Sequence, residues 1–177
     1  RRDEMLSFWS KVEDGTIPTR VTHNDTKINN ILFDKQGEVL CAIDLDTVMA
    51  STSLNDFGDA IRSYANTGDE DDRDLSRVGL SLEMFRAYTE GYLSQRAKQL
   101  TDSEIDHLAF SARYITFEQV LRFLMDYIDG DTYYKVKYPG HNLVRTHAQY
   151  RLLQSMEEHY GEMCRIVRET VDKYRKA

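Results

Sequence analysis

Basic residues form no run in this sequence, and the formal net charge at pH 7 is −7. Because binding to nucleic-acid phosphates needs a basic surface, we expect no nucleic acid partner. Apolar residues form no stretch long enough to span a membrane, and no secretory signal is recognisable. We therefore expect no membrane contact and a cytoplasmic location.

Cysteine is also scarce, with Cys41 in a predicted strand and Cys164 in a predicted helix. Two such residues form neither a disulfide framework nor a metal-ligand pattern. We interpret both as buried thiols in a reducing cytoplasm. The length of 177 residues and the hydrophobic share of 41% predict one domain with an ordinary core.

A polar loop over residues 22–30 carries the main functional signal. It contains the pattern H-x-D-x-K-x-x-N, formed by His23, Asp25, Lys27 and Asn30. Apolar runs follow over 31–33 and 39–43, and Asp44 comes directly after the second. A loop, a hairpin and a further Asp is the arrangement that kinases use for phosphoryl transfer. The loop alone is also typical of a plain turn, and the hairpin with its final Asp is what makes the pattern specific.

Each residue of this pattern has an expected role. Asp25 would accept or orient the proton of the attacking hydroxyl. Asn30 and Asp44 offer the carbonyl and carboxylate oxygens that suit Mg²⁺ on the phosphates of ATP. Lys27 would offset charge on the transferred phosphoryl group. His23 would be structural and would hold the loop by hydrogen bonds.

A second short segment resembles a magnesium-binding motif but does not follow a predicted strand. Residues 56–58 read D-F-G, yet no predicted strand precedes them. The residues around them instead have the capping and apolar spacing of a helix start. We therefore assign the metal to Asp44 and expect Asp56 to brace the polar loop by hydrogen bonds.

The remaining chain is predicted to be helical, so the fold class would be mainly α with a small β-hairpin. Apolar spacing predicts helices over 3–14, 54–66, 81–94, 101–128 and 144–174. Thr101 and Glu104 form a capping box at the start of the longest helix. The second hairpin run is apolar throughout, so it should be covered on both faces. Trp9 should be part of the core.

Candidate substrate residues are found after Asp44. Asp46 is either a solvated loop residue or a hydrogen-bond partner of the substrate. Arg122 is flanked by apolar residues, so it should form an internal ion pair or clamp a substrate. A tyrosine segment (residues 129–142) contains three tyrosines, two lysines and a histidine. Such a segment can simply pack, or its ring faces can cover the apolar side of a sugar.

Several segments resemble a known enzyme family. The segments THNDTKINNILFD, AIDLDTVM and SLNDFGDAIR resemble the aminoglycoside phosphotransferase and choline kinase superfamily, which has a protein kinase-like fold. RFLMDYIDGDTYYK and GHNL resemble, within it, the N-acetylhexosamine 1-kinases.

The resemblance implies an ATP- and Mg²⁺-dependent phosphotransferase. Its acceptor would be the anomeric hydroxyl of N-acetylglucosamine or N-acetylgalactosamine, and its product the sugar 1-phosphate. The resemblance makes Asp25 the catalytic base, and Asn30 and Asp44 the magnesium ligands. The residues that it brings to the sugar are Asp44 or Asp46, Arg122 and Tyr133.

Only the C-terminal lobe of that fold is recognisable. The residues before Asp25 offer no glycine-rich loop and no strand lysine paired with a helix glutamate. We therefore expect residues 1–177 to be a single C-terminal catalytic lobe that lacks the N-terminal nucleotide lobe and is inactive alone. The face that would meet that lobe should be apolar enough to pack against a neighbour, including a second copy.

Two other functions fit the same residues. One is the same chemistry on another small alcohol, such as an aminoglycoside, choline or homoserine. An acidic run (residues 68–74), which we expect in an exposed loop, could attract a cationic acceptor. The other is a kinase-like module that binds partners without catalysis, although the presence of Asp25, Asn30 and Asp44 favours an enzyme.

Overall fold

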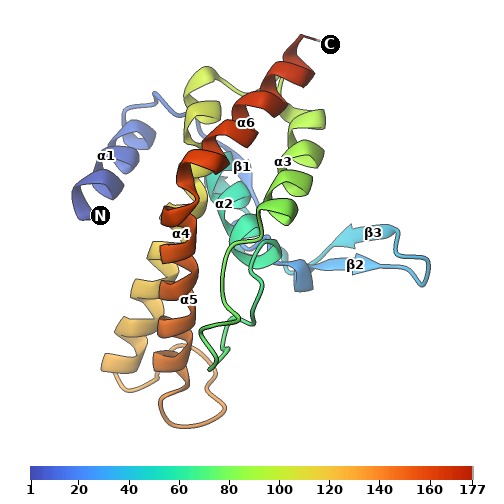
Figure 1. Cartoon of the computed structure of the whole chain (residues 1–177). Coiled ribbons are helices and arrows are strands. Elements are labelled where there is room, and N and C mark those ends of the chain that lie inside the picture. Colours follow the sequence, from blue (N-terminus) through green and yellow to red (C-terminus); the bar gives the residue numbers. More distant parts are fainter. Residues whose placement is uncertain (177) are drawn as a thin grey trace.

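The structure is a computed structural model and describes residues 1–176 (Figure 1). Its α-helices are α1 (Arg2–Glu13), α2 (Ser53–Tyr64), α3 (Leu82–Arg96), α4 (Asp102–Ile128), α5 (His141–Glu158) and α6 (Tyr160–Arg175). Its strands are β1 (Arg20–Thr22), β2 (Ile31–Phe33), β3 (Val39–Ala42) and β4 (Met49–Ser51). Two 3₁₀ turns, η1 (Ile28–Asn30) and η2 (Leu45–Thr47), flank the β2–β3 hairpin. The fold is therefore mainly helical with a little β-structure, as the sequence predicts.

The helices form one packed body, from which the hairpin projects (Figure 1). Helix α4 runs beside α5 over most of its length and also packs against α2. Helix α6 continues beyond α5 and packs against α3. Helix α2 thus lies between the longest helix and strand β1, which it also contacts. The polar loop follows β1 and reaches the start of α2.

The starts of three helices follow local sequence signals. The side chains of Thr52 and Ser81 accept hydrogen bonds from backbone N–H groups in the first turns of α2 and α3. Thr101 and Glu104 form the predicted capping box of α4. These caps satisfy N–H groups that have no partner within the helix, and they fix where each helix begins.

The core lies where α2, α3, α4 and α6 meet. Phe57 of α2 is fully buried, with ring centroids 6.3 Å from Phe85 and 5.2 Å from Tyr92 of α3. The next residue, Gly58, faces α4 so closely that a Cβ there would lie 2.4 Å from the Ser111 carbonyl oxygen. The last two residues of the D-F-G sequence therefore have packing roles: Phe57 fills the core, and Gly58 allows α2 and α4 to approach closely.

Several sequence predictions about the elements are wrong. The helix predicted over 144–174 is two helices that meet at His159, and the first already begins at His141. The apolar stripe continues across this break, so its spacing does not reveal the break. Strands β1 and β4 were not predicted; they pair antiparallel, with Arg20 opposite Ser51. Three-residue strands are too short to show an apolar alternation.

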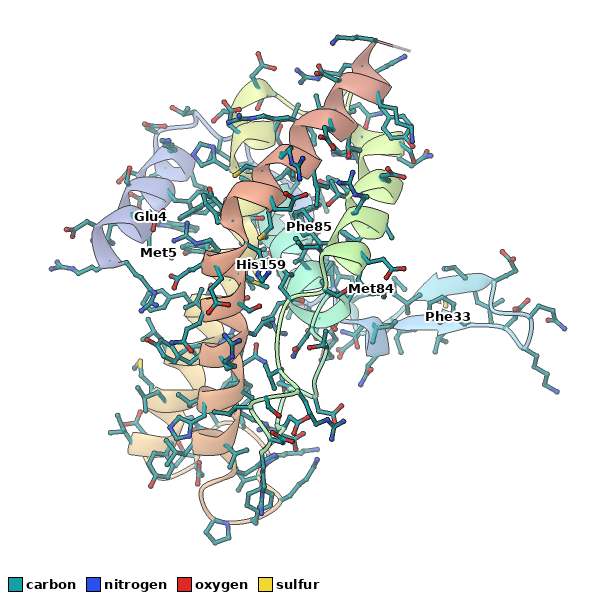
Figure 2. All side chains as sticks on the ribbon, in the orientation of Figure 1. Glu4, Met5, Phe33, Met84, Phe85 and His159 are labelled. Atoms are coloured by element: carbon teal, nitrogen blue, oxygen red, sulfur yellow. The ribbon has the colours of Figure 1, made fainter. Side chains whose placement is uncertain are left out.

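Burial of the hairpin was also predicted wrongly. All four β3 residues are exposed, including Cys41, and Val39 and Leu40 are each 63% exposed. Figure 2 shows Phe33 on this hairpin, away from the helices. Cys164 is only partly buried. An apolar run indicates burial only when another element covers it, and no described element covers this one.

Trp9 is not a core residue either, because 39% of it is exposed. Helix α1 buries only Met5 and Phe8, which lie on one narrow stripe, and Trp9 follows on the next face. Among the described residues, no helix is both long enough and apolar enough to cross a membrane.

Candidate active site

The first turn of α2 fixes the polar loop. The backbone N–H groups of His23 and Asn24 donate to the Asp56 carboxylate at 3.0 and 2.7 Å. The Thr26 hydroxyl donates to the Asp56 carbonyl oxygen at 2.7 Å. Asn24 has a φ of 60°, in the left-handed region, which turns the chain sharply just before Asp25. Hydrogen bonds from two backbone N–H groups and one hydroxyl to Asp56 thus help to fix the loop conformation.

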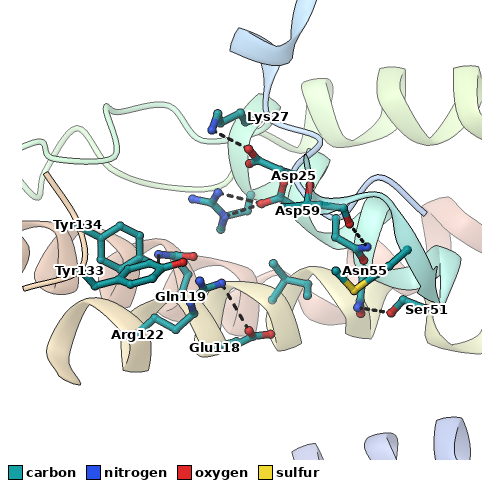
Figure 3. Close-up of a pocket in the computed structure, with 15 residues that line it drawn as sticks. Asp25, Lys27, Ser51, Asn55, Asp59, Glu118, Gln119, Arg122, Tyr133 and Tyr134 are labelled. Atoms are coloured by element: carbon teal, nitrogen blue, oxygen red, sulfur yellow. Dashed lines mark hydrogen bonds and ion pairs between the residues drawn. The ribbon is translucent and has the colours of Figure 1, made fainter. Parts of the chain in front are cut away.

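Asp25, Lys27 and Asn30 lie together in this loop (Figure 3 shows the first two). Lys27 Nζ donates to Asp25 Oδ2 at 2.8 Å, and Asn30 Nδ2 donates to the same oxygen at 2.8 Å. Asn30 Nδ2 also donates to the Asp25 backbone oxygen at 2.9 Å. Asn30 is buried, whereas Asp25 is half-buried. Asp25 therefore presents a fixed carboxylate with one oxygen already bonded.

Asp44 is brought next to Asn30 through the backbone. The Ile43 N–H donates to the Asn30 carbonyl oxygen at 2.9 Å, and the His23 ring nitrogen Nε2 lies 3.0 Å from the Ile43 carbonyl oxygen. Asp44 follows with a φ of 63° and precedes η2. Its side chain is exposed and makes no capping hydrogen bond to that turn. The carboxylate of Asp44 is thus presented to solvent beside the polar loop.

The oxygens of Asn30 and Asp44 match the preferences of Mg²⁺. Both are hard ligands, and the hydrogen bonds of Asn30 Nδ2 to Asp25 leave its amide oxygen as the ligand atom. Within residues 1–176, no three His, Cys, Asp or Glu residues gather into a group that could hold a metal ion.

An open cavity of about 450 Å³ begins at Asp25 and Lys27; we call it the acceptor cavity. The polar loop, α2, α4 and the tyrosine segment form its walls (Figure 3). Of the predicted substrate residues, Arg122 and Tyr133 line it. Asp46 is an exposed residue of η2 and does not line the cavity. Asn30 and Asp44 are not among the lining residues either. Four of the predicted site residues, Asp25, Lys27, Arg122 and Tyr133, therefore line one cavity.

Arg122 forms a half-exposed ion pair and also lies near two aromatic rings. Its guanidinium lies 3.9 Å from the Glu118 carboxylate, one helical turn earlier. The guanidinium carbon also lies 5.9 Å from the ring centroid of Tyr133 and 5.8 Å from that of Tyr134, within cation–π range. Arg122 thus forms an ion pair and still remains half-exposed at the cavity wall.

Glu118 lies in the same wall and is not an ordinary surface carboxylate. Loss of water at the concave surface raises the pKa of Glu118, and the nearby Asp59 raises it further, whereas Arg122 and Arg62 act in the opposite direction. About half of its side chain is nevertheless exposed to the cavity. A half-exposed carboxyl group in a cavity wall can hydrogen-bond to a hydroxyl-bearing ligand.

Sequence reasoning missed a buried ion pair in the cavity wall. Arg62 donates to Asp59 Oδ1 at 2.8 and 3.0 Å, and both side chains are nearly inaccessible to solvent. Arg62 also donates to Glu70 at 2.8 Å. The Thr26 hydroxyl lies 3.4 Å from Asp59 Oδ2 and links this pair to the polar loop. The only sequence signal was the i,i+3 spacing of Asp and Arg, which exposed helix faces share.

The acidic run is tied to the rest of the protein. His141 Nε2 and Lys137 Nζ lie 2.8 and 3.0 Å from the carboxylate of Asp71, and these two partners lower the pKa of Asp71 to about 2. Glu70 is bonded to Arg62, and Arg77 lies 3.5 Å from Asp72. The run therefore connects α2 to the tyrosine segment, and much of its charge is already neutralised by internal partners.

A model of the phosphotransferase enzyme family (APH) matches residues 1–92 of this chain. That match covers just over half of the 177 residues. It includes the polar loop, the hairpin, Asp44 and helix α2, which are the elements that surround Asp25 in the structure. The chain therefore belongs to the APH family of phosphotransferase enzymes.

Proposed function

We propose that this chain is the acceptor-binding catalytic lobe of a small-molecule kinase. Its reaction would transfer the γ-phosphoryl group of ATP to the anomeric hydroxyl of an N-acetylhexosamine. The observation that carries the proposal is the fixed Asp25 carboxylate at the opening of a cavity whose volume suits a small ligand. Family membership supports phosphoryl transfer, and the choice of a sugar rests on the resemblance and on the cavity wall.

The proposed chemistry divides between the two oxygens of Asp25. Lys27 and Asn30 bond Oδ2, which leaves Oδ1 to accept the proton of the sugar hydroxyl. That hydroxyl oxygen forms a bond to the γ-phosphorus as the bond to the bridging oxygen of ADP breaks. Lys27 is close enough to Asp25 to turn toward the transferred group and offset its charge. Asn30 and Asp44 would hold Mg²⁺, which neutralises charge on the ATP phosphates when bound.

The far wall of the acceptor cavity would bind the sugar. The rings of Tyr133 and Tyr134 can cover the apolar face of a pyranose, while Arg122, Glu118 and Gln119 can bond its hydroxyl and acetamido groups. Asp46 lies outside the cavity in this structure, so we do not assign it to the sugar.

Nucleotide binding would need a second lobe. We propose that the exposed apolar surface of the β2–β3 hairpin packs against a nucleotide-binding lobe, or against a second copy when that lobe is missing. The exposed hairpin residues that support this proposal are Leu32, Phe33, Val39 and Leu40. Without such a lobe, residues 1–177 would not turn over substrate.

A panel of acceptors tests the proposed reaction. The full-length gene product is incubated with γ-labelled ATP, Mg²⁺ and, in separate reactions, N-acetylglucosamine, N-acetylgalactosamine, kanamycin, choline and homoserine. We expect label at the anomeric position of an N-acetylhexosamine. Label on kanamycin or choline and on neither sugar would overturn the sugar assignment. Absence of Mg²⁺-dependent ATP binding in calorimetry would favour a binding module without catalysis.

A further inference from the structure

The tyrosine segment begins with a tight reversal of the chain at the end of α4. Gly130 and Asp131 have φ values of 90° and 59°, both in the left-handed region. The Asp131 N–H donates to the backbone oxygen of Asp126 at 2.7 Å. The reversal therefore directs the next backbone N–H groups toward the last turn of α4, where the Asp126 side chain lies.

The Asp126 carboxylate accepts four hydrogen bonds. The N–H groups of Thr132 and Tyr133 donate to Oδ1 at 2.9 and 2.8 Å. The Tyr134 N–H donates to Oδ2 at 3.0 Å, and Asn142 Nδ2 donates to the same oxygen at 2.7 Å. Asp126 is only 6% exposed, so its carboxylate has lost its hydrogen bonds to water. The four protein donors compensate for that loss. We call this arrangement the Asp126 clamp.

Asn142 joins the two ends of the tyrosine segment. It lies at the start of α5 and is fully buried. Its side-chain nitrogen donates both to Asp126 and, at 2.8 Å, to Asp131 Oδ1. Arg145 donates to its side-chain oxygen at 3.0 Å. The clamp therefore holds the segment at its first turn and at its return to the helical body.

The residues between these ends form a wall of the acceptor cavity. The ring of Tyr134 lies 4.8 Å from that of Phe123, and its hydroxyl accepts from Gln119 Nε2 at 3.2 Å. The ring of Tyr133 stands perpendicular to that of Tyr134, with centroids 4.8 Å apart. Tyr133 is 73% exposed, so the protein packs little against its side chain. Its position depends chiefly on its backbone, which Asp126 holds.

The charge of Asp126 matters to this arrangement. Burial alone would raise the pKa of Asp126, but hydrogen bonds from the three backbone N–H groups and from Asn142 outweigh burial and lower it. The side chain is thus an anion at neutral pH. All four partners are donors, so a side chain that itself carries N–H groups cannot replace it.

We propose that Asp126 is a positioning residue for acceptor specificity, which acts by holding Tyr133 and Tyr134 against the acceptor cavity. Asp126 is buried and does not line the acceptor cavity. This inference rests on the proposed function, because it assigns the tyrosine wall to the acceptor. It predicts that loss of the clamp weakens acceptor binding and leaves the phosphoryl-transfer step itself intact.

Asp126→Asn tests the clamp in the full-length protein. The variant keeps the size of the side chain, but its NH₂ group replaces a carboxylate oxygen and faces N–H groups that are themselves donors. We expect hydrogen exchange at amides 132–134 to accelerate at least about tenfold. We expect the KM for the acceptor to rise about tenfold or more, while kcat and the KM for ATP change less than about twofold. Asp106→Asn, an exposed change near the start of the same helix, is the matched control and should change none of these values.

A double-mutant cycle separates positioning from general destabilisation. Tyr133→Ala removes an exposed ring and should also raise the acceptor KM. If Asp126 acts through this ring, the double variant should have nearly the same KM as Tyr133→Ala alone. The inference would be overturned if the two substitutions raised the acceptor KM independently, so that their effects multiplied in the double variant. It would also be overturned if Asp126→Asn accelerated hydrogen exchange at amides 132–134 but left the acceptor KM unchanged.

Two further outcomes remain interpretable. If Asp126→Asn does not fold by circular dichroism, Asn142→Ala removes one of the four donors and should shift the acceptor KM in the same direction; no shift overturns the inference. If the wild-type protein phosphorylates no acceptor of the panel, the proposed function is wrong, and the inference about acceptor specificity fails with it. The exchange rates at 132–134 then still decide whether Asp126 orders the segment.

Discussion

The side-chain nitrogen of Asn30 donates to both the carboxylate and the backbone oxygen of Asp25, at 2.8 and 2.9 Å. One amide group therefore fixes the rotamer of the proposed base and the backbone that carries it. The same two bonds orient the opposite end of the amide, its carbonyl oxygen, away from Asp25. Asn30 can thus support Asp25 and offer a magnesium ligand at the same time, and the two roles can be separated by mutation.

Asp25→Asn should abolish most of the activity and leave the fold intact. The amide that this variant carries at position 25 cannot take the proton from the hydroxyl group of the acceptor substrate, so we expect kcat to fall by about 10²–10⁴. The lost ion pair with Lys27 is partly exposed and should change Tm by no more than about 4 °C. Steady-state kinetics and thermal unfolding of the full-length protein measure both values. Asp106→Asn, at an exposed position of α4, serves as the control. Wild-type turnover by Asp25→Asn would refute the role given to Asp25.

Two substitutions of Asn30 should have different effects. Asn30→Ala removes the metal oxygen and the hydrogen bonds to Asp25, so both kcat and the apparent affinity for Mg²⁺ should fall. Asn30→Asp keeps an oxygen ligand but places a second carboxylate against Asp25, so kcat should fall while Mg²⁺ affinity is retained. Magnesium titration of the steady-state rate distinguishes them. Equal magnesium dependence in both variants and in the wild type would show that Asn30 does not bind the metal.

Local signals made parts of this molecule predictable. The capping box at Thr101 and Glu104 depends on residues three positions apart, and the structure contains it. The polar loop and hairpin are likewise contiguous in sequence. By contrast, the partners in β1 and β4 are far apart in sequence: Thr22 pairs with Met49, and Arg20 pairs with Ser51. No local pattern encodes that pairing.

Predictions failed where burial decides the outcome. The apolar run of β3 resembles a buried strand, but burial depends on which surface packs against it. The spacing of Asp59 and Arg62 resembles a surface ion pair, but here the pair is buried beside the polar loop. The sequence indicated a tyrosine-rich segment, yet nothing in it showed that Asp126 would receive the amides of Tyr133 and Tyr134. These relationships arise only from the packing of distant elements.

Gly58 should be intolerant of any side chain. A Cβ there would lie 2.4 Å from the backbone oxygen of Ser111, which cannot move without displacing α4 from α2. We expect Gly58→Ala to lower the free energy of unfolding by about 1–3 kcal/mol. Gly91→Ala is the matched control, since Gly91 lies within α3 with open space around it and should gain up to about 1 kcal/mol of helix stability. Urea unfolding of both variants measures the difference; equal stability would contradict the close approach of the two helices.

Glu104 should make stability depend on pH in the acid range. Burial alone would raise the pKa of Glu104, but hydrogen bonds from Arg20, the Thr101 backbone and Ser53 lower it to about 2. Because the folded protein binds this proton less readily than the unfolded chain, the stabilisation is fully present above the unfolded pKa of about 4.5 and is lost as pH falls toward 2.

Glu104→Gln tests this dependence directly. The variant cannot titrate at this position, so the slope of its unfolding free energy between about pH 4.5 and pH 2 should be smaller than that of the wild type. It should also be less stable at pH 7, because Arg20 loses its charged partner at 2.6 and 2.7 Å. Glu83→Gln, in the first turn of α3, controls for the loss of one acidic group. If the curves of unfolding free energy against pH are parallel for the wild type and Glu104→Gln, another carboxylate governs acid stability. A group whose pKa is the same in the folded and unfolded states contributes no slope to such a curve.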